Sequence, residues 1–600
     1  MKNKYIRRIF LSQFLILDKI KSILTKKEIE RGYIFLFLMF ISMFFETLGI
    51  GLIAPLVTAI SDPNILISNN YLSGVIEFLK ISDFKSLILI FSISLVVIYL
   101  VKNLFLSYFT WFKIHYLSTL RMNLSNRLFK IYLSQPYTFH LQHNSGQLIQ
   151  NTISEVTVFT GRLLGPMLVI LTEGLVFLGI VILLFYIEPI GAISVTILLG
   201  LVTKLILSLT RKNISRWGKE RQYHDGKKIQ HLQQGLGGVK DALILGKEEH
   251  FLKQFQHHNL LGRRPDQKQA FLQEVPRFLF EFLAVIGLII IILSMTLQGK
   301  QISLILATLG IFGAAAFRLM PSITRILAAI QSVRYGFPVL EKLHQEFDNI
   351  DSGFNINEYK ESLNSFSEPS NSLVFNNVSY SYPNTTKASL KNASLKIYQG
   401  ESIGIIGPSG AGKSTLVDIL LGLLKPEFGK VNIDDQDIHN NLRSWQDQIG
   451  YVPQFIYLTD DSLRNNIAFG VVRKDIDDSL IDRVISSAQL TDFVGGLPEG
   501  LDTHVGERGV RLSGGQRQRI GIARALYHNP NIIVLDEATS SLDNITEKRI
   551  METVFLLKQH KTVIIIAHRM STLESCNRIY RLENGEIVEM GSPEKLLKNG

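Results

Sequence analysis

A glycine-rich loop between residues 407 and 415 carries the clearest chemical signature in the sequence. The run GPSGAGKST begins at Gly407, follows the apolar stretch 402–406 and precedes a helical apolar pattern. Glycines let backbone N–H groups surround phosphate oxygens at the positive end of the next helix. Lys413 is expected to reach the β- and γ-phosphates, and Ser414 to ligate Mg²⁺. The pattern predicts ATP or GTP binding by Gly407, Ser409, Gly410, Gly412, Lys413, Ser414 and Thr415.

Two further apolar strands end in residues that suit hydrolysis of the bound nucleotide. Asp536 and Glu537 follow the run 531–535, and His568 follows the run 562–567. The ends of such strands meet at one edge of an open α/β sheet, where ligands bind. We therefore expect Asp536 to hold Mg²⁺, Glu537 to activate the attacking water as general base, and His568 to lie beside them.

The composition indicates that membrane-spanning helices make up much of the chain. Of 600 residues, 46% are hydrophobic and only 19% charged, against roughly 25% charged in soluble domains. Crossing the membrane as a helix takes about 20 apolar residues. Such runs occur at 32–60, 87–109, 163–187, 190–209, 278–297 and 302–330. The single cysteine, Cys576, excludes a disulfide framework and a cysteine-based zinc cluster.

The basic residues are concentrated on one side of these predicted spans. Segments 1–31, 110–162 and 210–277 are rich in Lys and Arg, whereas the opposite connections contain few. The positive-inside rule therefore places both termini and the two long loops in the cytoplasm. This explains the net charge of +11 without invoking nucleic acid. We expect a multi-pass membrane protein.

The changes in composition predict four regions. Residues 1–31 form a basic, amphipathic N-terminal segment, and 32–340 a six-span helical transmembrane domain. Residues 341–372 are polar and read as a linker, and 373–600 alternate strands and helices as an α/β P-loop nucleotide-binding domain. Residues 71–81 have helical periodicity and would lie at the outer surface of the membrane.

The sequence LSGGQ at 512–516 makes the second domain resemble an ATP-binding cassette (ABC) ATPase. This resemblance implies that Tyr382 stacks on adenine and that Gln454 touches Mg²⁺ and senses the membrane domain. It also implies that Ser541-Leu542-Asp543 forms the D-loop, where Ser541 replaces the alanine of many relatives. Two cassettes of this family sandwich two ATP molecules. The resemblance therefore adds to the ATP site Ser513, Gly514, Gly515, Gln516 and Asp543.

Six spans followed by a C-terminal cassette resemble the half-transporter architecture of ABC exporters. One cassette per chain implies a dimer, and intact motifs favour a homodimer. The stretches 135–141 and 236–242 resemble the short coupling helices that carry cassette closure to the membrane domain. A soluble ABC factor is excluded by the spans, and an ABC protein without transport would be expected to lack Glu537 or His568.

Charged residues inside the predicted spans point to the cargo, because burying them in a membrane is costly. The spans contain Glu46, Lys102, Glu173, Arg277, Glu281, Arg318 and Arg325. Arg318 and Arg325 are two helical turns apart, and Arg277 and Glu281 are spaced for an i,i+4 pair. The basic groups would form an anion-binding cavity, with interhelical ion pairs as the alternative. The predicted cavity comprises Glu46, Lys102, Arg277, Glu281, Arg318 and Arg325.

Short stretches around these residues resemble the bacterial lipid-linked oligosaccharide flippases of PglK type. They are FETLGIGLIAPL from Phe45, VPR from Val275 and FRLMPSITR from Phe317. The resemblance implies ATP-driven movement of a polyprenyl-pyrophosphate oligosaccharide, or a related glycolipid, from the inner to the outer leaflet. The resemblance also implies a bacterial inner (cytoplasmic) membrane as the location, with membrane lipids and the lipid-linked glycan as partners and ATP and Mg²⁺ as cofactors. The alternative is an exporter of another amphiphile, such as a lipid, glycolipid or drug.

Overall fold

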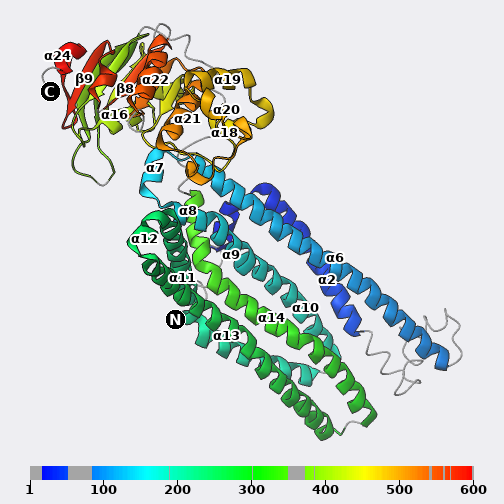
Figure 1. The fold of residues 1–600 in the computed structure, drawn as a ribbon. Helices are drawn as coiled ribbons and strands as arrows, with labels where there is room; N and C mark the ends of the chain where they lie inside the picture. The colour runs from blue at the N-terminus through cyan, green and yellow to red at the C-terminus, as the bar shows by residue number, and fades with distance from the viewer. Residues whose placement is uncertain are drawn as a thin grey trace. The chain divides into compact units, whose positions relative to one another are not determined.

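A computed structural model describes residues 16–51, 84–187, 189–299, 302–348, 372–383, 385–538, 543–557, 561–567 and 569–597. Contacts divide the chain into two compact units. The first comprises residues 1–135 and 143–354, and the second residues 136–142 and 355–600. Figure 1 shows the first as long helices and the second as an α/β domain, the predicted fold class.

Long helices form the first unit. They are α2 (Lys26–Gly51), α6 (Phe84–Leu133), α10 (Gly165–Ile187), α11 (Pro189–Gly237), α13 (Glu248–Leu297) and α14 (Ile302–Asp348). Among the described residues, four helical stretches are long and apolar enough to cross a membrane: Lys26–Gly49, Ser92–Leu133, Ser145–Tyr186 and Glu248–Leu297. The runs 190–209 and 302–330 lie within α11 and α14.

The helix α14 continues eight residues beyond the boundary expected at residue 340. Its last turns bury Leu340, Leu343 and Phe347, which are spaced three and four residues apart on one helix face. The guanidinium of Arg127 lies 4.3 Å from the Phe347 ring centre. Packing thus extends the helix into what the polar composition suggested was linker. The remainder of the linker, 349–371, and the predicted outer segment 71–81 lie outside the described residues.

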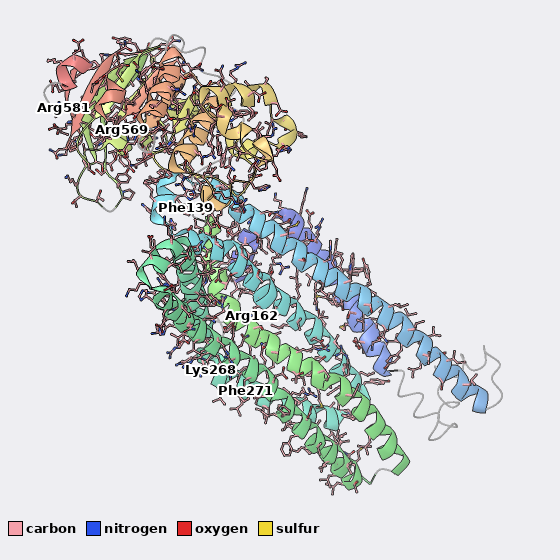
Figure 2. All side chains as sticks on the ribbon, in the orientation of Figure 1. Phe139, Arg162, Lys268, Phe271, Arg569 and Arg581 are labelled. Carbon is pink, nitrogen blue, oxygen red and sulfur yellow. The ribbon has the colours of Figure 1, made fainter. Side chains whose placement is uncertain are left out.

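Shorter elements join the long helices of the first unit. α8 (Ser145–Ile149) leads into the π-helical turn η1 (Gln150–Glu155), the short α9 (Val156–Val158) and a second π turn, η2 (Phe159–Leu164). Arg162 of η2, labelled in Figure 2, donates to Asp266 and Gln269 of α13 at 2.8 and 3.0 Å. The predicted coupling stretches 135–141 and 236–242 overlap two short helices, α7 (Tyr137–Gln142) and α12 (Val239–Leu245).

Two sheets form the framework of the second unit. One has four strands in the order β2-β1-β4-β5 and the other six in the order β10-β9-β3-β8-β7-β6. The strands are β1 (Ser372–Tyr380), β2 (Leu390–Tyr398), β3 (Ser402–Ile406), β4 (Phe428–Ile433), β5 (Gln436–Asp437), β6 (Ile449–Val452), β7 (Ile532–Asp536), β8 (Thr562–Ile566), β9 (Arg578–Glu583) and β10 (Glu586–Gly591). Strands β3, β8, β7 and β6 run parallel, which brings their carboxyl ends to one edge.

Apolar residues cover both faces of the six-stranded sheet. Along β8, Val563 and Ile565 enter one core cluster, while Ile564 and Ile566 enter the other. Such alternation is the period of a strand buried on both faces. The surrounding helices are α16 (Lys413–Leu420), α17 (Leu442–Asp447), α18 (Leu463–Ile467), α19 (Asp478–Ser487), α20 (Thr491–Gly495), α21 (Gly514–Tyr527), α22 (Asn544–Leu557), α23 (Met570–Leu573) and α24 (Pro593–Leu597).

Candidate functional site: the nucleotide centre and a charged helix network

The predicted P-loop joins the end of β3 to the start of α16. Gly410 and Gly412 adopt φ of 79° and 104°, a region that side chains disfavour. A Cβ on Gly412 would also approach the Ser389 carbonyl oxygen to 2.5 Å. These glycines are therefore required by the backbone path itself, which places Lys413 and Ser414 in the first turn of α16.

Lys413 lies inside this loop with its ammonium beside the backbone. Its Nζ donates to the carbonyl oxygens of Gly407 at 2.7 Å and Pro408 at 3.1 Å. Burial lowers the Lys413 pKa, opposed by the nearby negative charges of Glu537 and Asp536. A buried cation at a helix N-terminus suits the phosphates of a nucleotide. The loop thus fits the predicted ligand, and Ser409 and Gly410 lie within it.

Tyr382 lies beside the same helix. Its hydroxyl oxygen is 3.3 Å from Thr415 Oγ1, and its ring meets that of Tyr380 edge-on at 5.2 Å. The structure therefore brings an aromatic ring next to the P-loop across 33 residues of sequence. Stacking of this ring on adenine stays a prediction.

The predicted general base and the predicted sensor glutamine contact each other directly. Gln454 Nε2 donates to Glu537 Oε2 at 2.7 Å. Glu537 itself has a φ of 50°, a left-handed conformation that costs a non-glycine residue about 1–3 kcal/mol and concentrates at functional sites. Its backbone N–H donates to the Ile566 carbonyl of the neighbouring strand at 2.8 Å. The backbone thereby fixes Glu537 at the sheet edge beside Gln454.

The groups around Asp536 suit a divalent cation. Burial raises the pKa of Asp536, and the neighbouring Glu537 charge raises it further. A cation bound there would relieve both effects. The Gln454 amide nitrogen is used in the bond to Glu537, so its other amide atom is an oxygen, the ligand type that Mg²⁺ prefers. We expect Ser414, Gln454 and Asp536 to hold Mg²⁺, which would neutralise phosphate charge during hydrolysis.

His568 lies outside the described residues. Its neighbour Arg569, labelled in Figure 2, donates to Glu547 of α22, which also accepts from the Thr572 hydroxyl at 2.6 Å. These bonds anchor the chain immediately after His568. The role assigned to His568 stays a prediction.

The LSGGQ segment occupies the start of another helix, α21. Ser513 Oγ accepts from the Gln516 backbone N–H at 3.2 Å, and Gln516 Oε1 accepts from the Ser513 N–H at 2.7 Å. This reciprocal capping box leaves Gly514 and Gly515 in the first helical turn. The segment is thus a preformed helix N-terminus, a site suited to a phosphate. Its contact with ATP across a dimer stays a prediction.

Asp543 also acts as a cap in this structure. Its Oδ1 accepts from the backbone N–H groups of Ile545 and Thr546 at 3.1 and 2.9 Å. These hydrogen bonds, that from Thr546 first, lower the Asp543 pKa. The rest of the predicted D-loop, residues 541 and 542, lies outside the described residues.

Sequence reasoning did not identify two residues next to the metal-binding position. Tyr451 of β6 lies 3.5 Å from Asp536 Oδ2 through its hydroxyl. Asp418 of α16 has its pKa raised to about 6 by burial and by the charge of Asp536. Asp418 follows Ser414 by one helical turn, and this i,i+4 spacing could have indicated that its side chain lies on the same helix face as the predicted Mg²⁺ ligand.

Asp418 predicts a pH-dependent stability difference. Its folded pKa of about 6 exceeds the ordinary 3.8, so ionisation destabilises the fold progressively as pH rises from about 4 through 6. Asp418→Asn should avoid this loss and be more stable than the wild type by about 2 kcal/mol at pH 8. Thermal unfolding of the full chain without nucleotide, followed from pH 4.5 to 8, measures the difference. A difference that does not grow with pH contradicts the assignment.

Charged side chains join four helices of the first unit. Lys102 Nζ of α6 lies 2.8 Å from Glu46 Oε2 of α2, and Arg318 Nη2 of α14 lies 2.9 Å from Glu46 Oε1. On α10, Glu173 Oε1 is 2.8 Å from Arg325 Nη1. Arg318 therefore shares a helix face with Arg325, as predicted, and its Nη1 lies 3.6 Å from Glu173 Oε2.

The structure separates the predicted cavity residues into two groups. Arg277 and Glu281 form the expected i,i+4 pair at 3.0 Å, with side chains 67% and 48% exposed. Lys102, Arg318 and Arg325 instead meet Glu46 and Glu173, so the interhelical pairing considered as the alternative is present. Ser322, which sequence reasoning missed, donates to Glu173 Oε2 at 2.5 Å. We call Glu46, Lys102, Glu173, Arg318, Ser322 and Arg325 the charged helix network.

The fold and the nucleotide centre define an ATP-hydrolysing ABC transporter. The protein-family model described as "ABC transporter" matches residues 390–540 of this chain. A second family model, described as "ABC transporter transmembrane region", matches residues 48–313. The chain belongs to the ABC transporter family. Within it, the arrangement of one helical membrane unit and one cassette is that of an exporter half-transporter.

Particular relatives refine this placement. An ATP-dependent lipid A-core flippase of Cupriavidus metallidurans is 31% identical over 80% of this chain and 80% of its own. A Shewanella protein of the same description is 31% identical over 83% of this chain and 82% of its own length. A bacterial Atm1-family ABC exporter solved with ATP bound has the same fold, with a TM-score of 0.74 over 92% of this chain and 96% of its own at 23% identity.

Proposed function

We propose that this protein is an ATP-driven flippase that moves a phosphate-bearing glycolipid between membrane leaflets. The single observation that carries the proposal is the charged helix network. Three cations, Lys102, Arg318 and Arg325, surround only two carboxylates, Glu46 and Glu173. The network therefore has one surplus positive charge, and the Arg325 side chain is 58% exposed. An anionic headgroup is the cargo that such a charge balance favours.

The more specific proposal is a polyprenyl-pyrophosphate oligosaccharide carried from the inner to the outer leaflet. A pyrophosphate offers several oxygen acceptors to the paired N–H donors of Arg318 and Arg325. The second candidate is a lipid A-core glycolipid, which the description of the flippase relatives favours. In both, binding depends on phosphate charge. The protein would act in a bacterial inner membrane with both termini in the cytoplasm.

We further propose that the working form is a homodimer with two ATP molecules at its cassette interface. Each chain carries one P-loop at α16 and one LSGGQ segment at α21. A head-to-tail pair would supply each ATP with Lys413 from one chain and Ser513 from the other. Within this arrangement, Glu537 accepts the proton of the attacking water, and α7 and α12 would carry the closure to the membrane unit.

Reconstitution in liposomes tests the cargo. Purified protein is supplied separately with a lipid-linked pyrophosphate oligosaccharide, a lipid A-core glycolipid and an uncharged glycolipid, and movement of each headgroup is measured with ATP. We expect ATP-dependent movement of a phosphate-bearing lipid, none of the uncharged lipid, and none with Glu537→Gln. Movement of the uncharged lipid at the same rate would contradict the proposal.

A further inference from the structure

A polar cavity of about 380 Å³ lies among the non-apolar ends of the helices in the first unit. Its walls come from α8 and η1, from residues 219–230 of α11 and from Lys342 of α14. All of these positions lie outside the apolar runs of the sequence, on the side where basic residues are concentrated. The cavity is therefore distinct from the charged helix network, whose members lie within the apolar runs.

The lining of this cavity has an unusual composition. Of its eleven residues, six are Asn or Gln, three are Lys, and the remaining two are Tyr223 and Gly226. None of the eleven is acidic, and none is aliphatic. Amides donate and accept hydrogen bonds, as sugar hydroxyls do, whereas lysines bind phosphate. This lining disfavours a cationic ligand and suits one that carries both hydroxyls and phosphate.

Of the three cavity lysines, Lys342 is paired with a carboxylate, whereas Lys219 and Lys227 are not paired with one from the described residues. Lys342 Nζ lies 2.8 Å from Glu346 Oε1. By contrast, Lys227 Nζ donates to the neutral Gln230 Oε1 at 3.0 Å. Among the described parts of the chain, no carboxylate forms an ion pair with Lys219 or Lys227. The cavity thus presents two positive charges to a ligand.

The cavity floor is built and held in place by buried hydrogen bonds. Gln150 is 5% exposed and donates to Glu155 Oε1 and to the Gln222 carbonyl oxygen, both at 2.9 Å. Asn151 is 2% exposed and donates to the Tyr132 hydroxyl at 3.0 Å and to Glu346 Oε1 at 3.1 Å. These bonds use the amide nitrogens, which leaves the amide oxygens as acceptors for ligand hydroxyls.

Two carboxylates contact the floor amides, Glu155 and Glu346, and Glu346 is already paired with Lys342 at 2.8 Å. Glu155 is fully buried and also accepts from Arg221 at 3.3 Å and from Gln222 Nε2 at 3.1 Å. It therefore holds the floor amides in position and does not compete for the two free lysine charges. The positive charges of Lys219 and Lys227 are therefore available to attract an anion from outside.

The backbone around the floor is also specialised. Gln150 and Asn151 open the π-helical turn η1, and such turns occur frequently at functional sites. Opposite them, a Cβ on Gly226 would come within 2.5 Å of Gln150 Oε1. A side chain at Gly226 would displace the Gln150 amide. The space above Gln150 thus depends on glycine at 226.

We propose that this cavity binds the phosphorylated, hydroxyl-rich headgroup of the transported lipid before the headgroup reaches the charged helix network. This inference rests on the proposed function, because it assigns an entry site to the same cargo. Lys219 and Lys227 contact phosphate oxygens, the floor amides bind sugar hydroxyls, and the Tyr223 ring, in a residue 58% exposed, packs against a sugar face.

The test compares two pairs of lysine substitutions in the full-length protein in liposomes. Lys219→Gln/Lys227→Gln removes the two cavity charges, and Lys21→Gln/Lys253→Gln removes two charges from exposed lysines outside the cavity. ATP hydrolysis is followed while lipid-linked pyrophosphate oligosaccharide is titrated. We expect the cavity pair to raise the half-saturating lipid concentration at least about tenfold, with unchanged basal hydrolysis, and the control pair to leave it unchanged. An unchanged value in the cavity pair overturns the proposal.

A second measurement separates this inference from the proposed function. The labelling rate of Lys219 and Lys227 by an amine-reactive reagent is measured with and without inorganic pyrophosphate, while a non-hydrolysable ATP analogue fills the P-loops. Protection of both lysines, but not of Lys253, supports phosphate binding in the cavity. Failure of the wild type to move any phosphate-bearing lipid would contradict the proposed function without contradicting that binding. Protection by pyrophosphate without any change in the lipid titration of the Gln pair assigns the cavity to free phosphates and overturns the headgroup role.

Discussion

Glu537→Gln is expected to lower the rate of ATP hydrolysis at least about a hundredfold while ATP remains bound. The side chain keeps its size and can still accept the hydrogen bond that Gln454 donates to Glu537 at 2.7 Å. What it loses is the carboxylate that accepts a proton from the attacking water. Because Lys413 and the P-loop glycines are unchanged, ATP binding should persist while ATP hydrolysis stops.

The measurement combines steady-state phosphate release with retention of labelled ATP after rapid gel filtration. Glu586→Gln, the same change at an exposed position of β10, serves as the matched control and should hydrolyse ATP like the wild type. If the Glu537 variant turns over ATP at an undiminished rate, another group is the general base. Loss of ATP binding together with hydrolysis would instead assign Glu537 to nucleotide binding.

The nucleotide centre could be predicted from the sequence because its parts obey local rules. Gly412 must be glycine on account of its own backbone conformation, and Lys413 follows at a fixed spacing. Parallel strands then bring Gln454 and Glu537 into contact although 83 residues separate them. The motif residues and the topology together determine this site, so no knowledge of side-chain packing was needed.

The surroundings of the centre depend on packing and could not be predicted in the same way. Tyr451 and Asp418 approach Asp536 from β6 and α16, and neither belongs to a motif. The polar cavity likewise needs Gln150, Lys227 and Lys342 from three separate elements. Helical periodicity shows which residues share a face, but not which other helix that face meets.

The same limit applies to the charged residues of the membrane unit. Because burying a charged side chain in a membrane is costly, the sequence predicted that these residues are functional. Their seven-residue spacing correctly placed Arg318 and Arg325 on one helix face. The sequence left open whether they face cargo or each other. The structure pairs Arg318 with Glu46 and Arg325 with Glu173, so the cargo must compete with internal carboxylates for the guanidinium groups.

Arg318→Ala/Arg325→Ala is expected to lower flipping of the phosphate-bearing lipid about a hundredfold or more, since each charge-assisted hydrogen bond contributes about 1.5–3 kcal/mol. Basal ATP hydrolysis should stay close to the wild-type rate, because the nucleotide centre is unchanged. Flipping and hydrolysis are measured on the same proteoliposomes. Arg216→Ala removes an arginine that is 78% exposed and paired with Glu220, and it should leave both rates unchanged.

A companion variant separates loss of cargo binding from loss of structure. Removing Arg318 and Arg325 takes both arginine ion-pair partners from the buried Glu173, which can destabilise the helices. Glu173→Gln/Arg325→Gln removes both charges of one pair and leaves Arg318 with Glu46. This variant should remain folded, as judged by its unfolding temperature, and still flip the lipid poorly because Arg325 no longer binds phosphate. Wild-type flipping by a folded Glu173→Gln/Arg325→Gln protein would show that Arg325 does not recognise the cargo, and the Arg325–Glu173 pair would then be a structural feature alone.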